Sequence, residues 1–206
     1  MKTVLLINGS PHENGNTRTA LNEISKVLND HDIKTIIINI GKQPVQGCIA
    51  CGMCSRTGFC TFKDKLYLEI CNVVKDGVDG VILASPVYYG GPNGSVCAIM
   101  DRVCYSLNRY LQFKPAASVA VCRRGGASST FDRLNKYFTI LNMPVVSSQY
   151  WNIVYGQTPG QVLKDEEGMQ TMRTLAHNMA WMIERLDIQK LGHPELETPI
   201  RTNFIR

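Results

Sequence analysis

The sequence is poor in the features that mark membrane, secreted and nucleic-acid-binding proteins. None of its 206 residues lies in an apolar run near the roughly 20 residues that a membrane span requires. The first apolar run, residues 4–7, ends at Asn8 and is too short for a secretory signal. The net charge of +5 comes without a run of Lys and Arg that would form a nucleic-acid surface. We therefore expect a cytoplasmic protein that binds neither membranes nor nucleic acids.

Familiar catalytic constellations are also missing. The sequence has no Ser/His/Asp arrangement and no carboxylate pair that stands out, so we predict no catalytic acid or base from the protein itself. Its first glycine-containing loop lacks the lysine of a Walker loop and does not match the GxGxxG of dinucleotide-binding folds. No internal repeat, low-complexity segment or linker divides the chain, which suits a single domain.

What the sequence does contain is an alternation of two patterns. Short runs rich in β-branched residues lie at residues 3–8, 35–40, 80–85, 118–122 and 144–150. Continuous apolar runs of this kind are typical of parallel strands that helices cover on both faces. Between and after the runs, apolar residues recur at helical spacing, and the last such stripe is rich in methionine and is expected to pack in the core. The sequence predicts an α/β three-layer sandwich with a five-stranded parallel sheet over residues 1–186, followed by an irregular tail over residues 187–206.

The loop after the first predicted strand, residues 8–17, is rich in small hydroxyl and amide side chains and leads directly into a helix. Such a loop offers backbone N–H groups, side-chain donors and the positive end of the helix to a phosphate group. A capped turn that binds nothing is the alternative interpretation. The composition of this loop favours a phosphate site.

The loop after the third predicted strand, residues 85–94, combines two adjacent tyrosines with prolines and glycines. Glycine lets the backbone approach a flat ring closely, and aromatic side chains supply a surface for stacking. Ligands of open α/β sheets bind beyond the carboxyl ends of the strands, where both loops lie. We therefore expect one loop to take the phosphate and the other to take the ring of a single ligand.

Residues 9–11 (Gly-Ser-Pro), 16–17 (Asn-Thr) and 85–90 (Ser-Pro-Val-Tyr-Tyr-Gly) together resemble the NAD(P)H-dependent FMN reductases of the flavodoxin-like superfamily. The resemblance implies a flavodoxin-like fold with strand order 2-1-3-4-5, FMN as the cofactor, and a homodimer or homotetramer. It assigns the phosphate to the first loop and the isoalloxazine ring to the second, with a further loop after the fourth strand lining the same pocket. The implied FMN-binding residues are Ser10, His12, Asn14, Asn16, Thr17, Pro86, Val87, Tyr88, Tyr89, Gly90, Arg124 and Gly125.

Four of the eight cysteines crowd into one loop with the spacing C-x2-C-x2-C-x5-C, namely Cys48, Cys51, Cys54 and Cys60. Compact spacing of this kind lets four thiolates surround a 4Fe-4S cluster. It also resembles the spacing in the iron–sulfur flavoproteins, a branch of the same family. A structural zinc and a loop of unliganded thiols are the alternatives. The other four are expected to pack as small apolar side chains: Cys71, Cys97, Cys104 and Cys122.

These interpretations predict an FMN-dependent oxidoreductase that takes electrons from NADH or NADPH and passes them to a quinone, a flavin or another small acceptor. The alternative function is an iron–sulfur flavoprotein electron carrier, in which a 4Fe-4S cluster on the four loop cysteines exchanges single electrons with FMN and a ferredoxin-like protein. A third possibility is a signalling domain of the same fold that binds no flavin.

Overall fold

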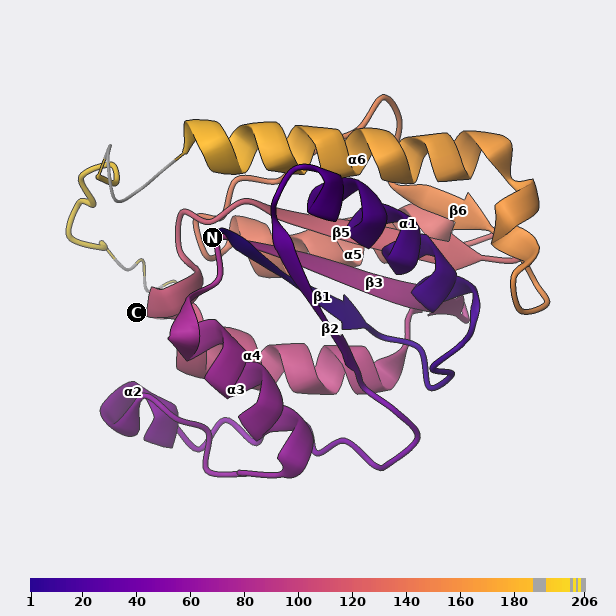
Figure 1. Ribbon diagram of the computed structural model, residues 1–206. Coiled ribbons are helices and arrows are strands. Elements are labelled where there is room, and N and C mark those ends of the chain that lie inside the picture. The colour runs from indigo at the N-terminus through magenta and orange to yellow at the C-terminus, as the bar shows by residue number, and fades with distance from the viewer. Residues whose placement is uncertain (187–191, 201, 203, 205–206) are drawn as a thin grey trace.

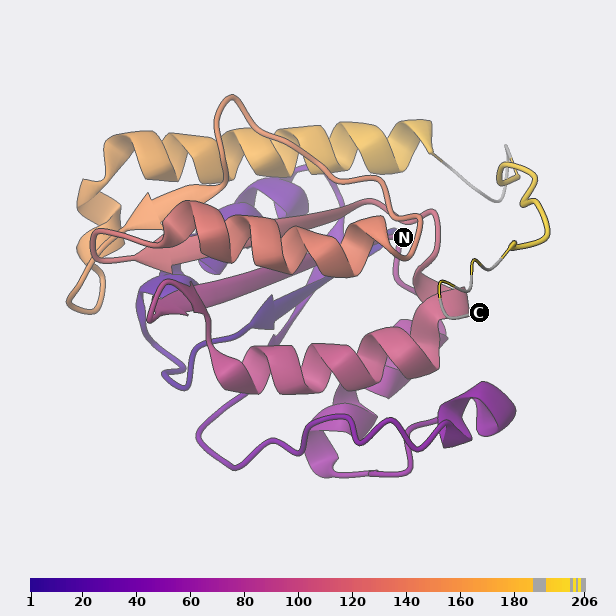
Figure 2. The same ribbon diagram turned by 180° about the vertical axis from the view of Figure 1, so that it is seen from behind.

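The computed structural model describes residues 1–186, 192–200, 202 and 204, which form a twisted sheet between two layers of helices (Figures 1 and 2). The parallel strands lie in the order β2-β1-β3-β5-β6, and the two-residue strand β4 pairs antiparallel with β3. The strands are β1 (Thr3–Asn8), β2 (Lys34–Asn39), β3 (Gly80–Tyr88), β4 (Gly91–Pro92), β5 (Ala116–Cys122) and β6 (Ile153–Tyr155). The helices are α1 (Asn16–Asp30), α2 (Met53–Thr57), α3 (Lys65–Gly77), α4 (Gly94–Leu111), α5 (Ala127–Thr139), the 3-10 helix η1 (Gln161–Lys164) and α6 (Glu166–Arg185).

The helices divide between the two faces of the sheet, as the apolar strands predict. Successive strand residues point to opposite faces. Thus Leu6 packs in the core beneath α1 and α6, while Leu5 packs in the core beneath α3, α4 and α5. The methionine-rich face of α6 lies in the first of these cores, which confirms its structural interpretation.

The sheet differs from the predicted one in two respects. It has six strands instead of five, because the chain after β3 turns back as the short strand β4. The parallel strands alone keep the order expected of a flavodoxin-like sheet. The predicted strand at residues 144–150 is wrong: Val145 makes an isolated bridge with Ala116, and the edge strand is β6. There the hydroxyl of Ser148 bonds to the Tyr150 carbonyl and the Asn152 side chain, which bends the chain out of the sheet.

The remaining cysteines pack as the sequence predicts. Cys71, Cys104 and Cys122 are buried, and Cys97 is half-buried. Burial raises the pKa of the Cys104 thiol to about 12, so this side chain stays protonated and unreactive at neutral pH. These thiols serve packing.

The end of the chain adds little to this fold. The predicted irregular tail begins with residues 187–191, which lie outside the described residues, and residues 192–200 form neither helix nor strand. None of the helices described by the structure is long and apolar enough to cross a membrane.

Candidate functional site

A cavity of about 920 Å³ opens at the carboxyl edge of the sheet. This volume lies at the upper end of the range for pockets that hold cofactor-sized ligands. Its walls come from the loops that follow all five parallel strands, which the topology brings to one edge. The lining residues are Ser10 to Thr17, Asn39, Gly41, Lys42, Pro86 to Tyr88, Val121 to Arg123, Gly156, Gln157 and Pro159.

One end of this cavity is the start of α1. The helix begins after Gly15 without any side chain capping it, although its first N–H groups need partners from outside the helix. Thr17 is buried in the first turn, Asn16 is half-buried, and both line the cavity. The first turn holds no acidic residue. The first N–H groups, which have no acceptor within the helix, the hydroxyl and amide side chains and the positive end of a 15-residue helix are together suited to an anion.

The loop before α1 is held in shape by its own polar groups. The Ser10 N–H donates to Asn8 Oδ1 over 3.1 Å, and the His12 N–H donates to Ser10 Oγ over 3.1 Å. Asn8 in turn donates to the Asn39 side chain over 2.9 Å, which ties the ends of β1 and β2 together. Gly9 is required here because a Cβ atom would lie 2.5 Å from the Ala84 carbonyl oxygen of β3. These contacts fix the path of the first part of the loop.

The ionisable side chains of the cavity favour a negatively charged ligand. Lys42 and Arg123 line it from the loops after β2 and β5, and His12 lines it from the loop after β1. Glu13 is the acidic residue among the lining side chains. This balance is positive at neutral pH and complements a phosphate.

The opposite wall is the start of the hairpin between β3 and β4, where Pro86, Val87 and Tyr88 line the cavity. The turn of this hairpin is Tyr89-Gly90, and both residues have positive φ angles, 51° and 76°, as a type I′ turn requires. The Ser129 hydroxyl donates to the Gly90 carbonyl and fastens the turn to α5. Gly126 has a φ of 84°, and a Cβ atom there would lie 2.6 Å from the Gly90 Cα atom. The hairpin is thus packed tightly against the loop after β5.

Tyr89 is strained and fully exposed. A non-glycine residue in the left-handed region costs about 1–2 kcal/mol, and asparagine tolerates that region best. We expect Tyr89→Asn to stabilise the ligand-free protein by about 1 kcal/mol, measured as a higher urea midpoint with an unchanged slope. As a control, Tyr150→Asn removes an exposed tyrosine whose φ is not positive and should bring no gain. Equal effects of the two variants would contradict the assignment of strain to Tyr89.

The structure brings together most of the residues that the sequence assigns to FMN. Eight of the twelve line this cavity: Ser10, His12, Asn14, Asn16, Thr17, Pro86, Val87 and Tyr88. The other four are not among the lining residues and are exposed at its rim or beyond: Tyr89, Gly90, Arg124 and Gly125.

The loop after β6 is the part of the cavity that the sequence analysis missed. Gly156, Gln157 and Pro159 belong to it, and a Cβ atom on Gly156 would lie 3.0 Å from the Asn16 side chain. The loop escaped notice because the last strand was expected at residues 144–150. Its signal was present as a short β-branched run, residues 153–155, followed by a segment with two glycines and a proline.

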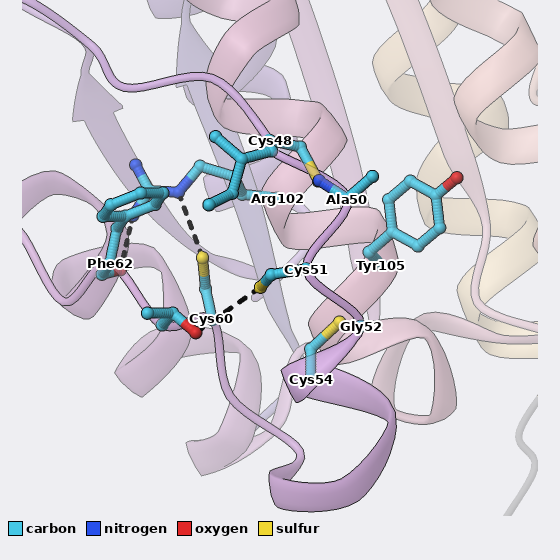
Figure 3. A pocket seen from close by; sticks show the side chains of 11 residues that line it. Cys48, Ala50, Cys51, Gly52, Cys54, Cys60, Phe62, Arg102 and Tyr105 are labelled. Atoms are coloured by element: carbon cyan, nitrogen blue, oxygen red, sulfur yellow. Dashed lines mark hydrogen bonds between the residues drawn. The ribbon is translucent and has the colours of Figure 1, made fainter.

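The cysteine loop forms a second, smaller cavity of about 280 Å³ (Figure 3). The four cysteines reach it from the segment before α2, from α2 itself and from the segment after α2, and α4 supplies Arg102 and Tyr105. All four are free thiols. Ala50 and Gly52 have positive φ angles of 52° and 69°, which turn the chain tightly between the first three cysteines. The cavity is lined by Cys48, Cys51, Cys54, Cys60, Ile49, Ala50, Gly52, Thr61, Phe62, Arg102 and Tyr105.

Polar groups lie within hydrogen-bond distance of two of the sulfur atoms of this cavity, those of Cys48 and Cys51. The Ala50 N–H lies 3.4 Å from Cys48 Sγ, and the Thr61 hydroxyl lies 3.6 Å from Cys51 Sγ. Hydrogen bonds from the Met53 backbone and then from Thr61 lower the pKa of the Cys51 thiol. A lowered pKa favours the thiolate, which is the form that binds metals.

The described side chains form no ready-made site for a single metal ion. Across the part of the chain that the structure describes, no three Cys, His, Asp or Glu side chains lie close enough together to hold one ion. The four sulfur-bearing side chains are instead spread around the wall of a shared cavity. The structural zinc that the spacing left open would need four ligands that meet at one point.

Comparison with known proteins identifies relatives of this chain. Residues 2–158 match the family described as NADPH-dependent FMN reductase. An iron–sulfur flavoprotein of Methanocaldococcus jannaschii is 32% identical over 189 residues, which cover 88% of this chain and 97% of that protein. The structure of a flavodoxin from the domain Archaea aligns with a TM-score of 0.58 at 13% identity, covering 89% of this chain and 99% of that one. An NADH:FMN oxidoreductase in its apo form aligns with a TM-score of 0.60 at 16% identity, covering 94% and 92%. The two solved structures establish the flavodoxin-like fold.

Proposed function

The chain belongs to the NADPH-dependent FMN reductase family and is an FMN-dependent oxidoreductase, and from this premise we propose that FMN lies in the cavity at the carboxyl edge of the sheet. The observation that carries the proposal is that the loop of residues 10–17 and the hairpin residues 86–88 line one cavity. Bound FMN would accept hydride from a reduced nicotinamide and pass the electrons to a quinone, a flavin or another small acceptor. The bound nicotinamide would stack against the exposed face of the ring.

The protein contributes binding and orientation. The phosphate would lie at the start of α1, within reach of the N–H groups of the first turn and of the Ser10, Asn16 and Thr17 side chains. Pro86 and Val87 hold the chain extended where the ring would lie, and Tyr88 offers an aromatic surface at the cavity mouth. Lys42 and Arg123 supply positive charge. Pro86, Val87 and Tyr88 belong to β3 and are held by the sheet, so this wall would orient the ring.

We further propose that Cys48, Cys51, Cys54 and Cys60 hold a 4Fe-4S cluster. Three observations support this: the spacing in the sequence, the shared cavity, and the similarity to the iron–sulfur flavoprotein of M. jannaschii over 88% of the chain. In a cluster each cysteine binds a different iron at a different corner, so the sulfur atoms surround a volume and do not meet at a point. The cluster would supply single-electron transfer, which allows a ferredoxin-like protein to serve as a partner beside the nicotinamide.

The test is purification without oxygen, followed by an absorption spectrum and analysis of iron and flavin. We expect about four iron atoms per chain and one FMN. Cys51→Ala should abolish the iron signal and leave FMN bound, because the two cavities have no lining residue in common. The matched control is Cys97→Ala, a cysteine outside both cavities, which should keep both cofactors.

The outcomes separate the two parts of this proposal. A protein that stays colourless with added FMN would contradict the flavin site. A yellow protein that contains FMN but no iron, even after reconstitution with iron and sulfide, would retain the reductase and remove the cluster.

A further inference from the structure

Arg102 on α4 is the most deeply buried charged side chain beside the cysteine cavity, and its residue surface is only 1% exposed. It is buried on α4, on the same helix face as the buried residues Ile99 and Ser106, where a charge is costly without partners. A folded protein tolerates a buried arginine only if the N–H groups of its guanidinium have hydrogen-bond acceptors. The identity of its partners therefore indicates what it does.

The guanidinium group reaches three separate parts of the cysteine loop. Its Nη1 donates to the Gln46 carbonyl over 3.2 Å, and Nη2 donates to the Phe62 carbonyl and to the Asp64 carboxylate. Its Nε lies 3.4 Å from Cys60 Sγ and donates to that sulfur (Figure 3). These bonds fasten the segments before and after α2 to the same helix. Removing Arg102 would free both ends of the loop at once.

Cys60 is held from two sides as a result. Its sulfur accepts from Arg102, and its backbone N–H donates to the Tyr67 hydroxyl over 2.9 Å. The Tyr67 ring lies against the guanidinium, with 5.0 Å between the guanidinium carbon and the ring centroid. The Tyr67 hydroxyl also bonds to Ser106, one turn beyond Arg102 on α4. Cys60 is thus the cysteine whose sulfur is paired with a fixed positive charge.

We propose that Arg102 is a positioning residue that orients Cys60 and sets the reduction potential of the cluster through its N–H···S bond. The inference rests on the proposed function of the four cysteines. Reduction adds a negative charge to a cluster, and a hydrogen bond or a positive charge at a ligand sulfur stabilises the reduced state. Arg102 supplies both at one ligand, so it raises the potential.

The test is an anaerobic redox titration of the iron–sulfur signal in the whole protein, comparing wild type with Arg102→Lys. Lysine keeps a positive charge but has no N–H at the position of Nε. We expect reduction to become about tenfold less favourable, a decrease of about 59 mV for a one-electron couple. Asp64→Asn is the matched variant, because it leaves the Arg102 donor in place and removes a negative charge. The reduction potential of the cluster should be higher in this variant than in the wild type.

The result that overturns the inference is an Arg102→Lys potential equal to that of the wild type, with iron content retained. A decrease of the same size in both variants would also overturn it, because this would indicate general loosening of the loop. A wild type without iron would instead remove the proposed cluster on the four cysteines and leave the proposed flavin site untouched.

A second measurement covers the case in which Arg102→Lys fails to fold or to hold iron. Wild-type protein labelled with 15N-arginine and reduced without oxygen should show one arginine nitrogen coupled to the electron spin in electron–nuclear double resonance. The absence of that coupling would overturn the inference regardless of the variants.

Discussion

FMN affinity is expected to fall by about 100- to 10,000-fold when Asn16→Ala and Thr17→Ala are combined. Each side chain would lose a hydrogen bond to a charged phosphate, worth about 1.5–3 kcal/mol, and every 1.4 kcal/mol is about tenfold in the dissociation constant. Both side chains line the cavity at the start of α1, where solvent competes less than on an open surface. Titration of the quenching of flavin fluorescence gives the dissociation constants directly.

Two controls separate loss of the phosphate contact from damage to the fold. Riboflavin lacks the phosphate, so its affinity should change much less in the double variant than that of FMN. Thr19→Ala removes a hydroxyl from the same helix, but Thr19 donates to the Gly15 carbonyl and does not line the cavity. We expect this variant to bind FMN as the wild type does. An equal loss for both flavins would contradict the phosphate assignment.

Asp64→Asn should lower the free energy of unfolding by about 1.5 kcal/mol near pH 7. Removing one partner of a buried ion pair costs about 3–5 kcal/mol, because the other charge stays buried. Arg102 is that buried partner, but the Asp64 side chain is 43% exposed and screened by solvent, so the effect falls below that range. Asparagine can still accept the Tyr67 N–H as the cap of α3, so the change isolates the charge. Urea denaturation measures the difference.

The same variant predicts how stability depends on pH. Burial opposes ionisation of Asp64, but the hydrogen bonds from Arg102 and from the Tyr67 N–H outweigh it, and the pKa of this carboxyl lies below its usual value. A lowered pKa in the folded state contributes stability above the unfolded value, near 3.9, and that stability is lost as pH falls through the folded value. The difference in the free energy of unfolding between wild type and variant should be constant down to about pH 5 and should shrink below about pH 4.

The control for this prediction is an exposed ion pair elsewhere. Glu23 and Arg173 lie 2.7 Å apart on the surface of α1 and α6. Glu23→Gln should lower the free energy of unfolding by less than about 1 kcal/mol, because exposed ion pairs contribute no more than that. A cost as large as that of Asp64→Asn would show that the buried environment of Arg102 is not the cause.

The meeting of two loops in the cavity at the carboxyl edge of the sheet was predictable, because topology alone determines where these loops lie. Parallel strands with helical crossovers send every carboxyl end to one edge, so residues 10–17 and 86–88 could be paired without coordinates. The contribution of Lys42 was not predictable in this way, since nothing in its surrounding sequence differs from an ordinary solvated turn. The loop after β6 was missed because a β-branched run before it, residues 144–150, has the stronger strand pattern but bends out of the sheet at Ser148.

The cysteine cavity shows a different limit of sequence reasoning. The spacing of the four cysteines indicated that they belong together, because the gaps between them are short. Arg102 lies 42 positions after Cys60 in the sequence. It interrupts the apolar face of a helix, and from the sequence alone it resembles an ordinary charged residue at the edge of that face. Its role depends on the packing of α4 against the segments around α2, which only the tertiary structure supplies.

The helix α4 also connects the two cavities mechanically. Its cap, Asn93, is bonded to Ser85 at the base of the flavin hairpin, and Arg102 comes nine positions later on the same unbroken helix. At 1.5 Å per residue, these positions are about 14 Å apart along the axis. Loop movements can change the shape of either cavity, but the backbone hydrogen bonds of the helix keep the distance between the two cavities fixed. Substitutions can therefore change the side chains that line either cavity while the distance between the two cavities stays constant.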